Sequence, residues 1–246
     1  MRQQKLFASA AVLAMALAVA ACSRSAEDYA ADVDRSAEQD VVLKTLKETD
    51  PTFYGQVRDR AAGRLAAGET EPDVLAAVQN EMRAYGLRQA PHVAAAPGAS
   101  VIEVMQAEKA VIEHLQRTDV STCAQFAMAG LPVGYQPNGQ MKALIDRAAS
   151  ARLLAAQAGK ASPQQRSEPS QADFVAVYQT MLDGGLNEAD AQRFFGTGMG
   201  SAPERQQCDV TTAFYSAILE QPRARAETVS AFIIKTVAEQ MAPAGG

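Results

Sequence analysis

The sequence ASVIEVMQAEKAVIEHLQR at residues 99–117 indicates an amphipathic helix. When successive residues turn by about 100° around a helix axis, its large apolar side chains fall on a single stripe. The stripe consists of Val101, Val104, Met105, Val111, Ile112 and Leu115. The same period recurs along most of the chain, and no convincing alternating pattern typical of a strand accompanies it. We therefore predict an all-α fold, an irregular bundle of about nine or ten helices.

Proline residues mark several of the expected helix starts. Asp50-Pro51, Glu71-Pro72 and Ala202-Pro203 place proline where a first helical turn tolerates it. The expected helices cover approximately residues 37–47, 52–67, 72–85, 99–117, 120–129, 139–158, 171–182, 188–195, 203–220 and 224–241. The Ala- and Pro-rich residues 88–98 are predicted to be a linker. It would separate an N-terminal helical unit at 36–87 from a helical bundle at 99–246, although one continuous domain is the alternative.

The N-terminus has the order of features found in secretory signals. Residues 1–5 include two positive charges and no acid, and residues 6–21 form an uncharged apolar run. The core of a signal peptide is typically about 7–15 residues long, whereas a membrane-spanning helix needs roughly 20. The run ends in Val19-Ala20-Ala21-Cys22, which resembles the lipobox of bacterial lipoproteins.

This resemblance covers the signal alone and implies cleavage before Cys22 with lipidation of its thiol. Residues 1–21 would then be a signal peptide, and 22–35 a polar, lipidated tether on the periplasmic side of a bacterial membrane. Several acyl chains anchor firmly, because each buried methylene contributes about 0.8 kcal/mol. Ser23, not an acidic residue, follows the cysteine, and by resemblance to enterobacterial sorting this favours the outer membrane. Ordinary secretion with cleavage after Ala18-Val19-Ala20, or an uncleaved anchor, is the alternative.

The net charge and the lack of known ligand-binding motifs make several classes of ligand unexpected for this chain. The 246 residues have a formal net charge of −5, and loss of the signal peptide removes two positive charges and no negative one, leaving −7. Binding of nucleic acid and broad adsorption to anionic lipid both need clustered basic residues, so neither is expected. No cluster of His, Cys, Asp and Glu has metal-binding spacing, and no phosphate-binding loop follows a predicted strand. We therefore expect no metal, nucleotide or other cofactor.

The three cysteines of the chain allow one disulfide if the first is lipidated. Cys123 and Cys208 then remain as a pair, in a compartment that permits disulfides. We predict a bridge between them. Two buried free thiols are the alternative, because unpaired cysteine is a common core residue.

Two charged side chains fall on apolar helix faces. Glu108 lies near the middle of the stripe in residues 99–117, and Arg152 lies on the apolar face of the helix expected at 139–158. Burying a lone charge is costly, so a direct Glu108–Arg152 pair between the two helices is one hypothesis. The favoured interpretation places one or both at an exposed end of their stripes, where the aliphatic stems cover apolar surface.

Function is the least specified property of this sequence. Glu108 is a weak candidate for a general acid, and no other catalytic pattern occurs. The adjacent Phe194 and Phe195 point about 100° apart on a helix, and an exposed ring would suit a partner, although core packing is the favoured interpretation. We expect a lipid-anchored envelope protein that binds another protein as an accessory or scaffold. An envelope hydrolase using Glu108, and a carrier with an apolar pocket between helices, are the alternatives.

Overall fold

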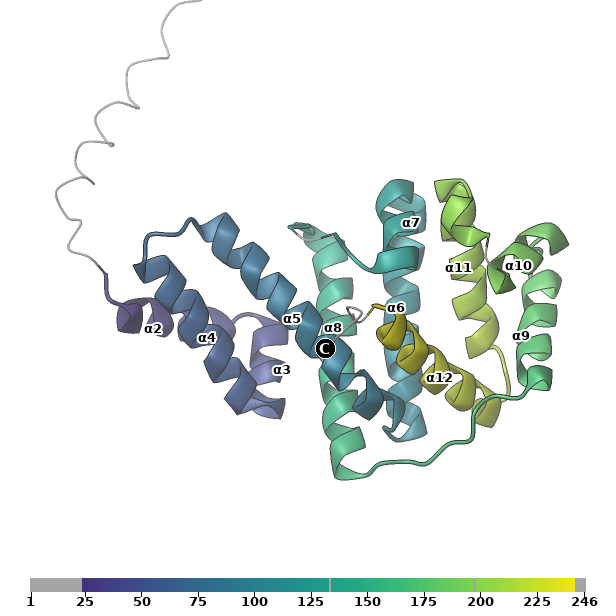
Figure 1. The fold of residues 1–246 in the computed structure, drawn as a ribbon, viewed down its shortest axis with the longest axis horizontal. Coiled ribbons are helices and arrows are strands. Elements are labelled where there is room, and N and C mark those ends of the chain that lie inside the picture. The colour runs from purple at the N-terminus through teal and green to yellow at the C-terminus, as the bar shows by residue number, and fades with distance from the viewer. Residues whose placement is uncertain (1–23, 133, 197, 242–246) are drawn as a thin grey trace, which may run out of the picture.

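The computed structural model describes residues 24–132, 134–196 and 198–241. These residues form eleven α-helices and one short 3₁₀ helix, with no strand among them, so the all-α prediction is confirmed. The helices are α2 (Ala26–Ala37), α3 (Val41–Thr49), α4 (Pro51–Ala66), α5 (Glu71–Ala94), α6 (Gly98–Thr118), α7 (Val120–Ala129), α8 (Gly139–Ala161), α9 (Gln171–Asp183), α10 (Glu188–Phe195), η1 (Met199–Ser201), α11 (Glu204–Leu219) and α12 (Arg223–Met241) (Figure 1).

Helix α2 occupies most of the segment that the sequence analysis assigned to a lipidated tether. Ser25 accepts a hydrogen bond from the backbone N–H of Asp28, whose carboxylate accepts one from the backbone N–H of Ser25, so the two form a capping box. Tyr54 of α4 donates a hydrogen bond to Asp34 at 2.8 Å, which holds α2 against α4. The tether prediction for residues 22–35 is therefore wrong from the start of α2 onward, because capping and tertiary contact outweigh polar composition.

Helix α5 extends through most of the predicted linker at 88–98. Pro91 lies inside this helix and removes one backbone hydrogen-bond donor. Alanine favours helix, however, and Ala90 and Val93 are buried in the core. Arg166 donates two hydrogen bonds to carbonyls at and just beyond the C-terminal end of α5. The linker prediction is wrong because this burial and capping offset the hydrogen bond lost at the proline.

Two apolar clusters share helices α5 and α8. The N-terminal cluster consists of Ala37, Leu46, Phe53, Tyr54, Val57, Tyr85 and Leu153. Tyr85 comes from α5 and Leu153 from α8, and the same helices supply Val93 and Ala155 to the larger central cluster. Because both clusters draw on the same two helices, the structure favours one continuous domain over a separate 36–87 unit.

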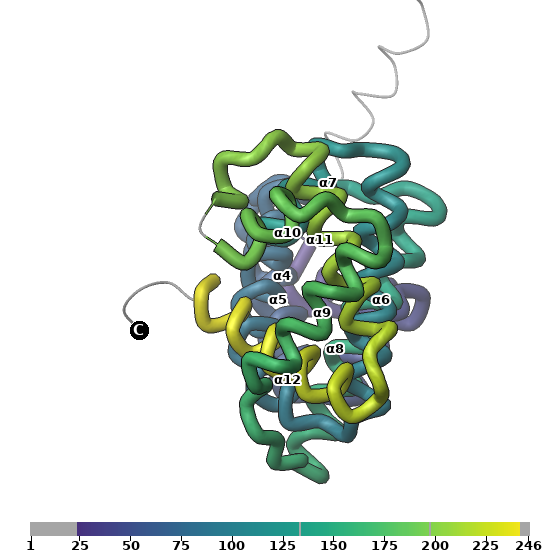
Figure 2. The backbone as a smooth tube through the Cα atoms, turned by 90° about the vertical axis from the view of Figure 1, so that its right-hand side faces the viewer, coloured from purple at the N-terminus to yellow at the C-terminus, as the bar shows by residue number. Residues whose placement is uncertain are grey.

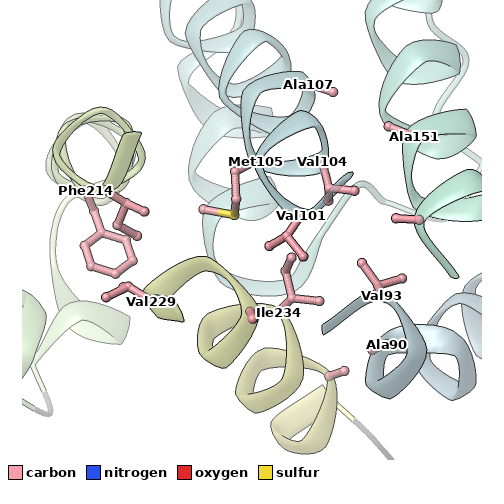
Figure 3. Packing of buried hydrophobic residues seen from close by; sticks show 14 of the residues in the cluster. Ala90, Val93, Val101, Val104, Met105, Ala107, Ala151, Phe214, Val229 and Ile234 are labelled. Carbon is pink, nitrogen blue, oxygen red and sulfur yellow. The ribbon is translucent and has the colours of Figure 1, made fainter. Parts of the chain in front are cut away.

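The central cluster is built around the helix that opened the sequence analysis. Val101 and Met105 of α6 have no exposed surface, and they face Ile234 of α12 (Figure 3). Phe214 of α11 and Val93 of α5 close the cluster on two other sides. Helix α6 is thus surrounded by neighbours, which explains why its apolar stripe is the clearest in the chain.

Helices α5 and α8 pack unusually closely at one point. Gly159 of α8 is buried, and a Cβ atom placed on it would lie 1.8 Å from the backbone carbonyl oxygen of His92. That separation is far below van der Waals contact, so only glycine permits this approach.

Helix α2 and the pair α9 and α10 lie at opposite ends of the molecule (Figure 1). Helix α2 lies at the left end in Figure 1, whereas α9 and α10 lie at the right end. Figure 2, turned to face that right end, shows α9 and α10 in front of the remaining helices. Within the described part of the chain, no helix combines the length and apolar character needed to span a membrane.

Candidate functional site

Glu108 lies in the middle of the α6 stripe, with only 5% of its surface exposed. Val104 and Ala107, which precede it, belong to the central cluster. Val111 and Ile112, which follow it, belong to a third cluster that also contains both described cysteines. The carboxylate therefore lies at the boundary between two apolar clusters, where it needs partners because a lone buried charge is costly.

Side chains from two neighbouring helices provide those partners. Arg152 of α8 contacts Glu108 Oε1 through both Nε and Nη2. The hydroxyl of Tyr215 in α11 donates a hydrogen bond to Glu108 Oε2 at 3.1 Å. The structure thus places the two residues paired in the sequence analysis in direct contact, and it adds Tyr215. We call Glu108, Arg152 and Tyr215 the polar triad, which links α6, α8 and α11.

Burial and charge act in opposite directions on the arginine of the triad. Burial acts to lower the pKa of Arg152, but the charge of Glu108 and its hydrogen bond outweigh burial and raise that pKa. Burial, followed by the charge of Glu108, raises the pKa of Tyr215 well above its ordinary value. The guanidinium therefore stays charged and the phenol stays protonated at ordinary pH, and both remain hydrogen-bond donors to Glu108.

This geometry favours a structural role for Glu108 over a catalytic one. A general acid must hold a proton that it can transfer to a substrate within hydrogen-bond reach. Here both carboxylate oxygens already accept contacts from the protein, one from a cation and one from a hydroxyl. The triad meets solvent mainly at Arg152, whose side chain is 38% exposed, whereas that of Glu108 is 7% exposed. The arrangement therefore supports the ion-pair hypothesis more than the hydrolase alternative.

A disulfide joins Cys123 of α7 to Cys208 of α11, with their Cα atoms 5.5 Å apart. Neither cysteine has exposed surface, and both pack in the third apolar cluster. Cys208 and Tyr215 are seven residues apart on α11, so they share one side of that helix. The disulfide and the polar triad therefore fasten α11 to its neighbours along the same side.

An open groove of about 560 Å³ borders the turn between α9 and α10. Residues 184–187 line one side of it, and Arg205 and Asp209 of α11 line another. Asp209 accepts a hydrogen bond from Gln116 of α6 at 2.8 Å and lies 3.8 Å from Arg205. These charged side chains are already partnered within the protein, so the groove by itself does not specify a ligand.

Large apolar side chains are exposed at several places on the described surface. They are Val41, Leu75, Met128, Leu154, Val175, Phe195 and Val237. At α9 and α10, Val175 is 57% exposed and Phe195 is 43% exposed. Phe194 packs inward against Phe214, with ring centroids 4.6 Å apart, so the two adjacent phenylalanines divide between core and surface. Sequence periodicity identified the aromatic pair but could not decide which ring a neighbouring helix covers.

Two further sequence predictions concern metals and lipid. In the described ranges, no group of three or more His, Cys, Asp or Glu side chains has an arrangement that could hold a metal ion. The predicted signal peptide at 1–21 and the predicted lipidation site Cys22 lie outside the described residues, so both stay predictions. Comparison with family models, with curated proteins and with solved structures found no match for this chain.

Proposed function

We propose that the chain is a lipid-anchored envelope protein that acts by binding another protein, as an accessory or scaffold. One observation supports this more than any other: large apolar side chains are exposed on a helical surface whose core is otherwise closely packed. On α9 and α10, Val175 and Phe195 are 57% and 43% exposed, and the ring of Phe195 packs against Tyr178 of α9. Neighbouring exposed apolar side chains are typical of sites that contact other proteins.

The start of the described chain is compatible with anchoring close to the bilayer. Helix α2 begins at Ala26, only four residues after the lipobox cysteine. Four extended residues span at most about 14 Å, so a lipid on Cys22 would hold α2 near the membrane surface. The opposite end of the molecule, at α9 and α10, would then face away from the anchor (Figure 1).

Anchoring is tested by replacing the lipobox cysteine. Wild-type protein should incorporate an alkyne-tagged palmitate and sediment with membranes, whereas Cys22→Ser should lose both properties. Ser23→Ala provides the matched control, because it changes the neighbouring residue and leaves the thiol. Retention of the fatty-acid label by the Cys22→Ser protein would refute lipidation at this residue.

Protein binding is tested by chemical cross-linking in intact cells, followed by purification of the tagged protein from solubilised membranes. We expect an envelope protein to be enriched over a control with an unrelated lipoprotein. Recovery equal to that control would contradict the scaffold function. Glu108→Gln distinguishes the hydrolase alternative: an enzyme would lose glycan cleavage while staying folded, whereas a structural glutamate would show lost stability.

A further inference from the structure

Helix α9 has apolar side chains on two of its sides, although it lies at the edge of the bundle. Its inner side contributes Val177 and Met181, which are at most 1% exposed. A second apolar ridge consists of Val175, Tyr178 and Leu182, at spacings of three and four residues that bring side chains together on one side of a helix. Val175 is 57% exposed, and Tyr178 and Leu182 are partly buried. The described residues therefore cover this second ridge only in part, whereas an apolar helix side is ordinarily covered.

Helix α10 extends the exposed ridge. Phe195 packs edge-to-face against Tyr178, with ring centroids 5.9 Å apart. Phe195 remains 43% exposed, and Val175, three residues before Tyr178 on α9, is 57% exposed. We define the distal face as the ridge Val175, Tyr178, Leu182 and Phe195 together with the exposed acids Asp183 and Glu188. It belongs to the two helices that stand in front in Figure 2.

The charges on the distal face are negative, and that of Asp183 lies at an unfavourable position. Asp183 is the last residue of α9, where no basic residue accompanies it in the final turn. The C-terminal end of a helix is itself negative, so a carboxylate there is electrostatically unfavourable. Among the described residues, the side chains of Asp183 and Glu188 each have only a neutral side-chain hydrogen-bond donor, from Gln179 and Gln192, both at 2.9 Å. Glu188 lies in the first turn of α10, where the helix dipole favours a carboxylate, so Asp183 is the less compensated of the two. A positively charged partner would compensate Asp183 and pair with Glu188.

The position of the distal face distinguishes a protein partner from the bilayer. Residues 1–23 lie outside the structure and join it at α2, at the other end of the molecule from α9 (Figure 1). With the lipid close to α2, the distal face is directed away from the membrane that anchors the chain. This step rests on the proposed function.

We infer that the distal face binds an amphipathic helix of a partner protein. Apolar side chains of that helix lie against Val175 and Phe195, and its basic side chains lie beside Asp183 and Glu188. A ridge of apolar side chains at helical spacing is the surface against which amphipathic helices pack in peptide recognition. The inference adds to the proposed function the surface used and the chemistry of its partner.

The first test uses a photo-reactive amino acid in the full-length protein in cells. It is placed in turn at Val175, on the distal face, and at Leu154 and Leu75, which are 51% and 43% exposed on α8 and α5. We expect a cross-link from position 175 alone, and mass spectrometry should locate it in a basic amphipathic helix of the partner. Cross-links only from the control positions would overturn the inference and leave protein binding intact. No cross-link from any position would remove support from both.

The second test uses purified protein lacking residues 1–21, without lipid, and two helical peptide probes of equal length and identical apolar face. One probe has lysines on its polar face and the other has glutamates. The lysine probe should change the NMR resonances of α9 and α10 and bind more tightly. The variant Asp183→Asn with Glu188→Gln should weaken it about fivefold, the effect of two exposed ion pairs.

Three results of the second test would overturn the inference. Equal affinity for the two probes would remove the role of charge. Concentration-dependent dimerisation abolished by Val175→Asp would identify a second copy of the chain as the occupant. Binding of the unlipidated protein to phosphatidylglycerol vesicles through the same residue would identify a lipid surface. Matched circular dichroism spectra of the variants establish that each is folded.

Discussion

Replacement of Arg152 by methionine should leave the Glu108 carboxylate stranded in the protein interior. The Glu108 side chain is 7% exposed, whereas that of Arg152 is 38% exposed, so removal of the arginine is the more damaging change. Breaking a buried ion pair by removing one partner typically costs about 3–5 kcal/mol. We expect about 3 kcal/mol for Arg152→Met, because Tyr215 still donates to the other carboxylate oxygen. We expect only about 1.5 kcal/mol for Glu108→Leu, because the remaining guanidinium can reach water.

The double variant Glu108→Leu with Arg152→Met allows the interaction energy between the two side chains to be measured apart from their other contacts. Neither desolvated charge remains, and two apolar side chains of similar length fill the space between α6 and α8. Such replacements are often nearly neutral, so we expect a loss within about 1.5 kcal/mol, part of it from the unpaired hydroxyl of Tyr215. The single changes would then sum to far more than the double change, with a coupling energy of about 3 kcal/mol.

The assay is urea unfolding of the chain lacking its signal peptide, with the disulfide intact, followed by far-ultraviolet circular dichroism. The four proteins of the cycle should unfold with the same denaturant dependence, so that their midpoints can be compared as free energies. A loss below about 1 kcal/mol for Arg152→Met, or a coupling below about 0.5 kcal/mol, is the behaviour of an exposed pair. Either value would refute the account of the polar triad as a buried ion pair.

Three further predictions follow from individual contacts. Gly159→Ala should destabilise the protein by about 3 kcal/mol, since its Cβ would meet a backbone carbonyl of α5. Gly63→Ala, in open space on α4, is the control and should be neutral or stabilising by up to about 1 kcal/mol. Equal urea unfolding midpoints for the two variants would contradict this prediction. Reduction of the disulfide, whose cysteines are 85 positions apart, should lower the free energy of unfolding by about 4–5 kcal/mol, and an unchanged urea midpoint after reduction would argue against the bridge. The Ser170 hydroxyl, followed by Arg225, lowers the pKa of Asp173 to about 2. Because a lowered carboxyl pKa stabilises the folded state above its ordinary value of 3.8, this contribution should be lost as pH falls from about 4 to 2. The carboxyl resonance should titrate near pH 2 and move upward in Arg225→Gln; a midpoint near 4 in the unmutated protein would contradict the assignment.

Much of the fold could be predicted because the period of an amphipathic helix is visible in consecutive residues of the sequence. The stripe in residues 99–117 matches α6 closely, since its core-facing side repeats with the helical period. The same reasoning placed Glu108 and Arg152 on apolar faces, where a charge requires a partner. Prediction from local composition failed where residues typical of a loop are held in a helix by contacts with distant segments. Polar residues suggested a tether where α2 packs on α4, and alanine with proline suggested a linker where α5 continues.

The sequence by itself determined the helical class, the inward faces of most helices and the small set of residues able to form a disulfide or an interior ion pair. Each of these depends on spacing along one helix, which the order of residues defines. Only the tertiary structure decided that Tyr215 completes the triad and that Val175 of α9 is left exposed by the described residues. Those properties depend on which distant segments meet. The packing of side chains depends on the shape of the whole folded chain, and the apolar pattern of one helix does not show which other helices will cover it.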